Sequence, residues 1–381
     1  MNTFLRDYIF IDQLGQGGFA SVYKVRHKDL DYIRAIRVLR DDVINKDDKR
    51  YQNFIKECKI LLRLGNGSHP NITHIYRPRL IENRAIVEMD YIDGSDLFHY
   101  IDEKNGFIEI DDVINLLSSI SSALSYCHYD IYKYCMDRQI DNLKDDPEDG
   151  KKVLLDEATI NRLVKKYKVI HNDIHSGNIM RREDGRYVLL DFGLSIDGED
   201  VVRSSKREGG APEFKAPEKW DVADDLSTQS DIYSFGIVLY SFLAGRVPFV
   251  FNKAIPETEA KFNLMNAHKK DIPEPIFNLR KIAFEATHPG ETYVKDYPDW
   301  LEKIILKCLE KDPKKRYKDG KELYDDCISH LPWNPSKKDS IDDIIVNPEP
   351  PKSVMARLWK NNLEYKAYYS DDNNFIYFSN N

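Results

Sequence analysis

The chain has 381 residues, of which 41% are hydrophobic and 12% aromatic, enough to build a substantial core and to exclude wholesale disorder. Its formal net charge of −8 at pH 7 argues against nucleic acid or an anionic membrane as the main partner. The five cysteines include no close Cys-x-x-Cys pair, which favours reduced thiols over disulfides or a zinc site. No apolar run approaches the roughly 18 residues that cross a bilayer, and Asp7 comes too early for a signal peptide. We therefore expect a soluble, cytoplasmic protein.

The segment from Tyr8 to about Tyr91 favours strands with one helix. A first strand starts near Tyr8 and leads into a glycine turn, and Ser21–His27 and Tyr32–Leu39 continue as strands rich in Val, Ile and Tyr. Tyr51–Leu64 has apolar residues at helical spacing and is followed by a glycine, so it is predicted to be a helix.

Beyond Gly94 the pattern becomes helical. Val113–His128 and Ser230–Ala244 are long apolar-rich segments without internal proline, and we expect both to be helices. Between them, Tyr129–Lys168 contains an acidic, polar stretch followed by a short predicted helix, Asp156–Lys168. A connection this long is either a tolerated surface insertion or a docking or regulatory element.

The tail from about Trp333 opens with prolines and ends in two aromatic segments. Tyr365–Tyr369 and Phe375–Ser379 flank a polar turn, Ser370–Asn374, which indicates a β-hairpin.

The sequence His-Asn-Asp-Ile-His-Ser-Gly-Asn at 171–178, followed by Asp-Phe-Gly at 191–193, carries the strongest chemical signal. Phosphoryl transfer needs an Asp that orients the hydroxyl nucleophile, an Asn that binds metal, and a second Asp that bridges Mg²⁺ to the phosphates. Asp173, Asn178 and Asp191 supply these groups in that order. The two segments resemble the catalytic loop and metal-binding motif of eukaryotic-type protein kinases.

This resemblance implies an α+β, two-lobed kinase fold. A small β-rich N-lobe with one helix would span residues 8–92, and a larger helical C-lobe with the insertion 129–168 would span 93–332. The tail, 333–381, is either a packed terminal hairpin or a hairpin docked on the kinase domain, since its last aromatic segment resembles the Phe-x-x-Phe motif with which some kinases clamp their own N-lobe. ATP and Mg²⁺ are the implied cofactors, and a protein is the implied substrate.

The glycine-rich turn after the first strand contains Gly15 and Gly17, where small residues let backbone N–H groups approach phosphates. In the third strand, Arg37 stands where the family has a Lys that contacts the α- and β-phosphates and pairs with a helix Glu, here Glu57. Arginine keeps the charge, but its planar fork does not replace a point-like ammonium. The pair could also be purely structural, and Lys24 is the alternative phosphate contact.

The other nucleotide contacts follow from the resemblance alone, because each residue by itself would be interpreted as core packing. They are Val22, Ala35 and Met180 around the adenine, Met89 at the gatekeeper position, Asp90 and Tyr91 at the hinge, and Asp96 at the ribose.

Two C-lobe motifs also match the family. Glu218 is expected to pair with Arg316, and Asp231 to anchor the catalytic loop through its backbone N–H groups. His171 is expected to be a structural histidine, hydrogen-bonded in the core.

Besides Arg37, three positions depart from the family pattern. Asn172 replaces the Arg that receives an activation-loop phosphate, and Ala211 replaces the Thr typical of Ser/Thr-specific members, which leaves the acceptor open. His175 stands where a Lys would contact the transferring phosphoryl, so pH sensitivity is conceivable. Ser204 and Ser205 are either phosphosites or part of a mobile loop.

Three functions remain open on the sequence. The leading hypothesis is a protein kinase that transfers the ATP γ-phosphate to a Ser or Thr hydroxyl. The substitutions at Arg37, His175 and Ala211 motivate a pseudokinase, acting as a nucleotide-binding or scaffold module. A small-molecule kinase has a similar His-x-Asp-x-His loop but lacks the Ala-Pro-Glu segment and the features around Asp231 and Arg316.

Overall fold

A computed structural model describes twelve stretches of the chain. They are residues 7–16, 20–39, 47, 49–64, 69–81, 84–135, 157–197, 211–220, 227–331, 353–360, 363–369 and 376–380. The chain divides into two compact units, Met1–Cys327 and Ile328–Asn381. Gly17, Ser204, Ser205 and the polar part of the predicted insertion, residues 136–156, lie outside the described residues.

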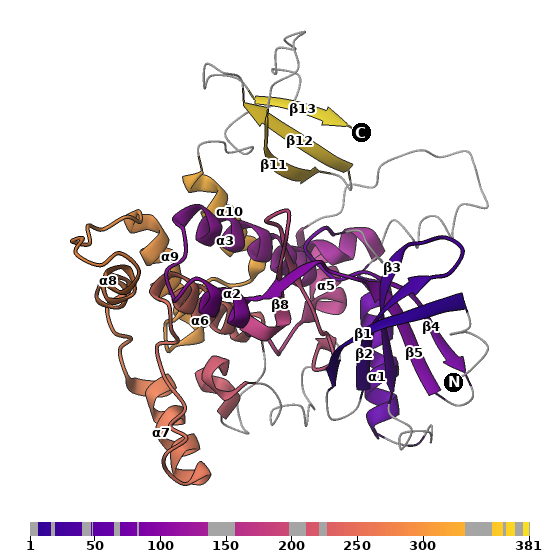
Figure 1. Cartoon of the computed structure of the whole chain (residues 1–381), viewed down its shortest axis with the longest axis horizontal. Helices are drawn as coiled ribbons and strands as arrows, with labels where there is room; N and C mark the ends of the chain where they lie inside the picture. Colours follow the sequence, from indigo (N-terminus) through magenta and orange to yellow (C-terminus); the bar gives the residue numbers. More distant parts are fainter. Residues whose placement is uncertain are drawn as a thin grey trace. The chain divides into compact units, whose positions relative to one another are not determined.

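The first unit begins with a five-stranded antiparallel sheet in the order β1-β2-β3-β5-β4 (Figure 1). The strands are β1 Tyr8–Gln16, β2 Ala20–His27, β3 Ile33–Leu39, β4 Ile75–Ile81 and β5 Arg84–Asp90, and one helix, α1 Lys49–Arg63, lies between β3 and β4 in the chain. The apolar side of α1, with Phe54, Cys58 and Leu61, is buried in the main core. Hydrophobic alternation in strands and helical spacing in α1 thus lead to the expected elements.

The rest of this unit is mainly helical (Figure 1). Its helices are α2 Leu97–Glu103, α3 Ile110–Ser125, α5 Glu157–Tyr167, α6 Thr228–Ala244, α7 Glu257–Lys270, α8 Ile276–Thr287, α9 Asp299–Cys308 and α10 Gly320–His330. Its strands are β6 Gly94–Asp96, β7 Val169–Ile170, β8 Ile179–Arg182, β9 Tyr187–Leu189 and β10 Ile196–Asp197. The α+β fold is therefore as predicted.

Helix α6 lies in the centre of this helical part and is buried on all sides. It contacts α3, α8 and α9. Most of its side chains beyond the first turn are apolar and lie on every face, so the helix needs such an environment. Helix α3 continues into one π-helical turn, Tyr126–Asp130, which turns His128 toward α6.

The β-rich part and the helical part meet through backbone bonds. The N–H of Thr73 donates to the carbonyl of Leu189, and the N–H of Leu189 donates to the carbonyl of Asn71. The Tyr126 hydroxyl donates to the carbonyl of Leu64. These bonds place the end of β9, and so the Asp-Phe-Gly segment that follows it, beside the five-stranded sheet.

The second unit contains a three-stranded antiparallel sheet, β11 Ser353–Lys360, β12 Leu363–Tyr369 and β13 Ile376–Asn380. Strands β12 and β13 pair antiparallel with Tyr369 opposite Ile376, as the predicted hairpin requires. Strand β11 was not predicted.

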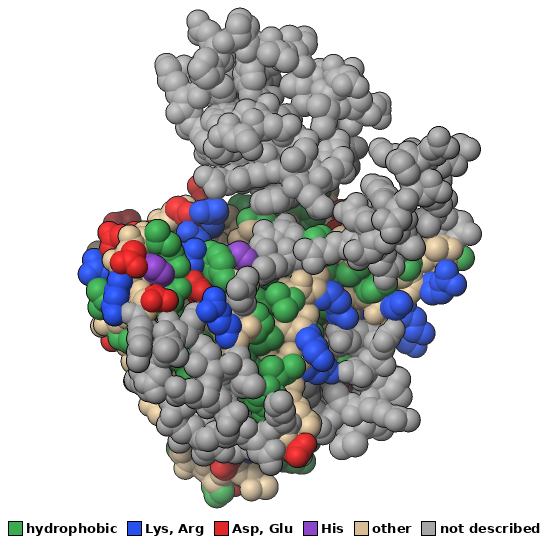
Figure 2. All heavy atoms as spheres, turned by 90° about the vertical axis from the view of Figure 1, so that its right-hand side faces the viewer, with side chains coloured by type: hydrophobic (Ala, Val, Ile, Leu, Met, Phe, Trp, Pro, Cys, Tyr) green, Lys and Arg blue, Asp and Glu red, His purple; other side chains and the backbone are tan. Residues whose placement is uncertain are grey.

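Among the described residues, no helix is long and apolar enough to cross a membrane. All five cysteines are free thiols. Figure 2 shows one face of the molecule, on which basic and acidic side chains lie among hydrophobic and uncharged groups.

Candidate active site

The catalytic loop, residues 171–178, is hydrogen-bonded to the first turn of α6. The Asp231 carboxylate accepts hydrogen bonds from the backbone N–H groups of His171 (2.6 Å) and Asn172 (2.8 Å), and lies 3.0 Å from Nε2 of His128. Burial opposes the charge of Asp231, but these bonds outweigh it and lower its pKa. The predicted anchoring by Asp231 is confirmed, whereas His128 was not identified from the sequence.

The loop brings Asp173 and Asn178 together. The Asn178 side-chain amide donates to the carbonyl oxygen of Asp173 (2.9 Å) and to its carboxylate (3.3 Å). His171 is fully buried, pairs through Nε2 with the carbonyl of Leu190 and accepts the N–H of Asp173, as expected of a structural histidine. Because the amide nitrogen of Asn178 serves as donor, the amide oxygen is the atom that remains for a metal ion.

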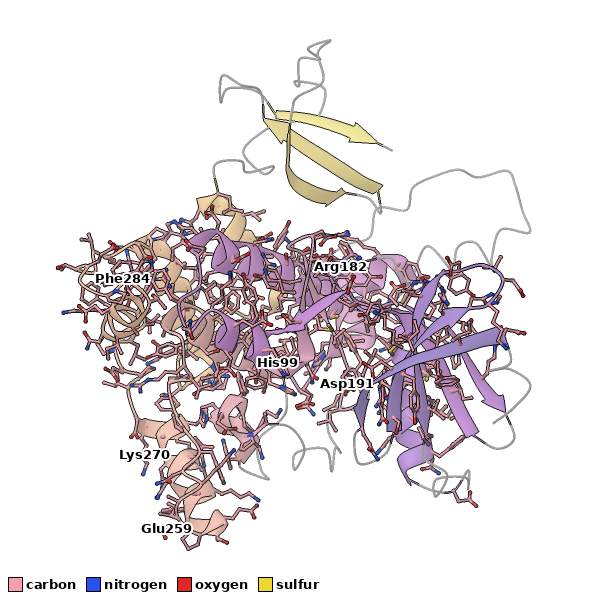
Figure 3. The ribbon with its side chains drawn as sticks, viewed as in Figure 1. His99, Arg182, Asp191, Glu259, Lys270 and Phe284 are labelled. Atoms are coloured by element: carbon pink, nitrogen blue, oxygen red, sulfur yellow. The ribbon has the colours of Figure 1, made fainter. Side chains whose placement is uncertain are left out.

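Arg37 on β3, Glu57 on α1 and Asp191 after β9 converge. The Arg37 guanidinium donates a hydrogen bond to the Glu57 carboxylate, and the same nitrogen lies 3.7 Å from the Asp191 carboxylate. Burial opposes the charge of Arg37, but the two carboxylates outweigh it and raise its pKa. In Figure 3, Asp191 lies beside the five-stranded sheet, whereas His99 lies on α2.

The Asp191 backbone adopts a left-handed conformation, with φ of 51°. Only a few per cent of residues other than glycine have positive φ, and Asp and Asn are enriched among them. The carboxylate accepts the N–H of Gly193 at 3.0 Å, a local bond of the kind that supports this conformation. The conformation and the bond fix where the carboxylate lies relative to Arg37.

His175 packs beside two aromatic rings, Phe98 and Phe214, at centroid distances of 6.3 and 6.0 Å, and the two phenyl rings also contact each other. Burial lowers its pKa, so the imidazole is neutral near pH 7. Its Nδ1 accepts the N–H of Gly177 at 3.1 Å, which leaves the proton on Nε2, 3.9 Å from the Asp173 carboxylate. His175 is thus a neutral donor rather than a substitute for an ammonium.

The residues predicted around the adenine come from β2, β3, β5 and β8. Val22 lies opposite Arg37, and Ala35 lies opposite Met89 in the next strand. Met180 on β8 pairs with Asp96 on β6. The register therefore brings Ala35 and Met89 together and Met180 next to Asp96.

The three polar residues predicted at the hinge and the ribose, Asp90, Tyr91 and Asp96, already have hydrogen-bond partners in the protein. The Lys24 ammonium donates to the Tyr91 hydroxyl (2.9 Å) and lies over its ring, so Lys24 is directed to the hinge rather than to Glu57. The Tyr76 hydroxyl donates to Asp90. Asp96 caps α2, accepts the N–H groups of Phe98 and His99, and contacts the His99 ring.

The second expected C-lobe pair is also present. Arg316 donates to both carboxylate oxygens of Glu218, at 2.8 and 2.9 Å, and both side chains are buried. The next residue, Lys219, is 5% exposed and donates to the carbonyl oxygen of Asn172 at 2.6 Å. Sequence reasoning missed Lys219, because nothing in its immediate neighbours indicates a side chain directed under the catalytic loop.

The donor set suits Mg²⁺ bound together with phosphates. No cluster of three or more His, Cys, Asp or Glu that could hold a metal by itself occurs in the part of the chain that the structure describes. Asp191 and Asn178 instead offer one carboxylate and one amide oxygen, and Mg²⁺ commonly takes one or two such ligands with phosphate oxygens and water.

Comparisons with known proteins agree with this geometry. The family model described as the protein kinase domain matches residues 8–136 and 158–330, leaving unmatched only a part of the expected insertion between them. A probable serine/threonine-protein kinase of Clostridium acetobutylicum is 27% identical over 84% of this chain and 39% of its own length.

Two further relatives carry similar names. Serine/threonine-protein kinase PrkC of Bacillus subtilis is 25% identical over 83% of this chain and 39% of its own. RAC-beta serine/threonine-protein kinase of Rattus norvegicus is 26% identical over 83% and 52%. The chain spans about two fifths of the length of the bacterial relatives it matches first. The family match covers most of the chain, which therefore belongs to the protein kinase domain family.

Proposed function

We propose that the chain is an ATP-dependent serine/threonine-protein kinase, which transfers the γ-phosphate of ATP to a Ser or Thr hydroxyl of a protein. Two linked groups carry the proposal: Asn178 bonds Asp173, and Arg37 contacts both Glu57 and Asp191. The N–H of Leu190, the residue before Asp191, donates to the carbonyl of Asn178 and so brings the two groups together. The names of the relatives support Ser and Thr as acceptors.

In this reaction Asp173 orients the acceptor hydroxyl and takes its proton as the oxygen bonds to the γ-phosphorus and the bond to the ADP leaving group breaks. Arg37, held by Glu57, directs positive charge at the nucleotide phosphates. Asn178 and Asp191 would hold Mg²⁺, which neutralises charge on the phosphate oxygens. The neutral Nε2–H of His175 can donate a hydrogen bond to the transferring group but adds no full charge.

The nucleotide would lie against β2, β3 and β5. Gly15 and Gly17 would allow backbone N–H groups to approach the phosphates, Val22, Ala35 and Met180 would enclose the adenine, and Met89, Asp90 and Tyr91 would line its edge. Asp96 would turn its Oδ2, which contacts the His99 ring, toward the ribose while Oδ1 keeps the helix-capping bonds.

The proposal is tested by intact mass after incubation with Mg-ATP and, in parallel, by phosphate transfer to degenerate peptides centred on Ser, Thr or Tyr. Asp191→Asn and Asp173→Asn are the controls. We expect phosphate on the wild type and on Ser or Thr peptides, and a loss of about 10²-fold or more in both variants. Absence of any transfer, together with no thermal stabilisation by Mg-ATP, would contradict the proposal and favour a pseudokinase.

A further inference from the structure

The catalytic loop carries no permanent positive charge of its own. Residues 171–178 include neither Lys nor Arg, and its His175 is neutral because burial lowers its pKa. A loop that positions a carboxylate against negatively charged phosphates gains from a nearby cation, since the interaction is strong where water is excluded. The structure contains such a cation next to the loop, hydrogen-bonded to the loop backbone.

That cation is the ammonium of Lys219. It comes from the short 3₁₀ turn Pro217–Trp220 and donates a 2.6 Å hydrogen bond to the carbonyl oxygen of Asn172, the residue before Asp173. Asn172 has φ of 67°, and its own backbone N–H is held by Asp231. Asn172 is therefore held at both of its peptide groups: a carboxylate accepts its N–H, and an ammonium donates to the carbonyl of the peptide that leads into Asp173.

The surroundings of Lys219 are acidic. Burial is the largest influence on it and lowers its pKa, while Asp231, Asp173 and Glu218 act in the opposite direction. Lys219 and Asp173 also line one small cavity, together with Ala211 and Ser234. The cation thus bonds the backbone before Asp173 and shares a cavity with the Asp173 side chain.

A purely packing role accounts poorly for a lysine at this place. Burying an ammonium costs free energy unless it is paired and hydrogen-bonded, and an apolar side chain of similar length would fill the same volume at lower cost. The hydrogen bond to Asn172 and the neighbouring carboxylates offset the cost of burying the ammonium. Both are available because the ammonium lies next to the catalytic loop.

We propose that Lys219 is a positioning residue of phosphoryl transfer: its ammonium holds the peptide that precedes Asp173 and supplies the positive charge that the catalytic loop lacks. The inference rests on the proposed function. It predicts an effect on the rate of transfer rather than on nucleotide binding, because Lys219 lies on the Asp173 side of the loop and not among the residues expected to contact ATP.

The test compares Lys219→Met, Lys219→Gln and Lys219→Arg in single-turnover phosphate transfer at varied ATP, with Mg²⁺ and the acceptor that the wild type labels. We expect Met and Gln to lower the maximal rate about 10- to 100-fold with the half-saturating ATP concentration within about twofold. Arg, which keeps the charge and a donor, should recover the rate to within a few-fold of the wild type.

Lys311→Met is the matched control, since Lys311 is partly buried and its ammonium also donates to a backbone carbonyl, that of Ala267, away from the loop. It should leave the transfer rate unchanged. If Lys219→Met does not fold, Lys219→Gln, which is polar and similar in length, carries the same comparison.

Three results would overturn the inference. Transfer by Lys219→Met and Lys219→Gln at the wild-type rate would show that the cation is not needed. An Arg variant as slow as the Met variant, or a change confined to the half-saturating ATP concentration, would show a structural or binding role. A wild type that transfers no phosphate removes the proposed function and this inference together, whereas the first three results leave the proposed function intact.

Discussion

Arg37 and Asp191 lie 3.7 Å apart, although they come from opposite ends of the site, one from β3 and the other from the segment after β9. The guanidinium nitrogen that approaches Asp191 is the one that bonds Glu57. A single cation therefore links the helix α1, the sheet and the candidate metal ligand. The arginine at this position thus makes the ion pair with Glu57 that the sequence comparison with the family predicts.

The first prediction concerns this arginine. Because Arg37 already contacts Glu57 and Asp191, we expect Arg37→Lys to give no large gain in phosphate transfer, and Arg37→Ala to lose about 10²–10³-fold. Single-turnover transfer to the acceptor labelled by the wild type measures both. A gain of tenfold or more in Arg37→Lys would instead show that arginine cripples the site. Lys24→Ala is the control, since Lys24 bonds Tyr91 and not Glu57.

The second prediction separates phosphate binding from packing at Gly15. A Cβ built on Gly15 meets no heavy atom within 4 Å, so Gly15→Ala should change the free energy of unfolding by less than about 0.5 kcal/mol. If the backbone there approaches phosphates, the same variant should raise the half-saturating ATP concentration.

Gly236→Ala is the contrasting variant, because it should change stability, which Gly15→Ala should leave nearly unchanged. A Cβ on Gly236 would lie 2.6 Å from the Cβ of Cys308 in the core, and we expect a loss of about 1–3 kcal/mol of stability in urea unfolding. Unchanged ATP dependence in Gly15→Ala would remove the support for a phosphate-binding turn.

The third prediction concerns the buried pair of Glu218 and Arg316. Arg316→Met leaves the Glu218 carboxylate buried without its partner, so the free energy of unfolding should fall by about 3–5 kcal/mol. Lys321→Ala, which removes an exposed pair with Asp325, should cost less than about 1 kcal/mol. Urea titrations at pH 7 measure both, and equal losses in the two variants would contradict the prediction.

The same pair has a pH signature. Burial raises the pKa of Glu218, but Arg316 outweighs burial and holds it below 4.5. Because the folded-state pKa is lowered, the pair stabilises the protein above about pH 4.5, and this contribution is lost as the pH falls through the folded-state value.

The fourth prediction uses His268, which is fully buried beside the Tyr233 hydroxyl, 2.9 Å from its Nδ1. Burial lowers its pKa from 6.5 to about 3. The unfolded chain therefore binds the proton first, and stability falls as the pH drops from 6.5 toward 3, by about 2 kcal/mol at pH 5.

His268→Gln should remove that part of the pH dependence, measured as the difference in free energy of unfolding between pH 7 and pH 5. His99→Gln is the control, because His99 is exposed and its bond to Asp96 raises its pKa, which gives a small effect of opposite sign. An unchanged difference in His268→Gln would show that another group controls the acid sensitivity.

Much of the site was predictable, because its groups lie in contiguous motifs. The spacing within 171–178 places Asp173 and Asn178 on one short loop, where the structure shows a hydrogen bond between them. Asp231 and the pair Glu218–Arg316 also follow from motif order. The long elements were predictable as well, since α6 is apolar over four turns and β2 and β3 are rich in β-branched residues.

Other contacts depend on tertiary arrangement and could not be predicted. Lys219 follows Glu218 directly, and only the 3₁₀ turn that contains both residues directs their side chains to different partners. Lys24 bonds Tyr91 because the segment after β5 runs beside β2, which the sequence around Lys24 does not indicate. Strand β11 combines Met, Ala, Leu, Arg and Lys, residues that favour helices, so its pairing with β12 overrides local propensity.

Because Asp231 lies on α6, substitutions in the core around this helix can affect the catalytic loop. The helix that is buried on every side also holds the backbone of the catalytic loop at its first turn. A core substitution that shifts α6 by a fraction of an ångström would move the peptide before Asp173 while most of the fold remained intact. We therefore expect substitutions in this helix to lower the proposed phosphate transfer before they lower the free energy of unfolding.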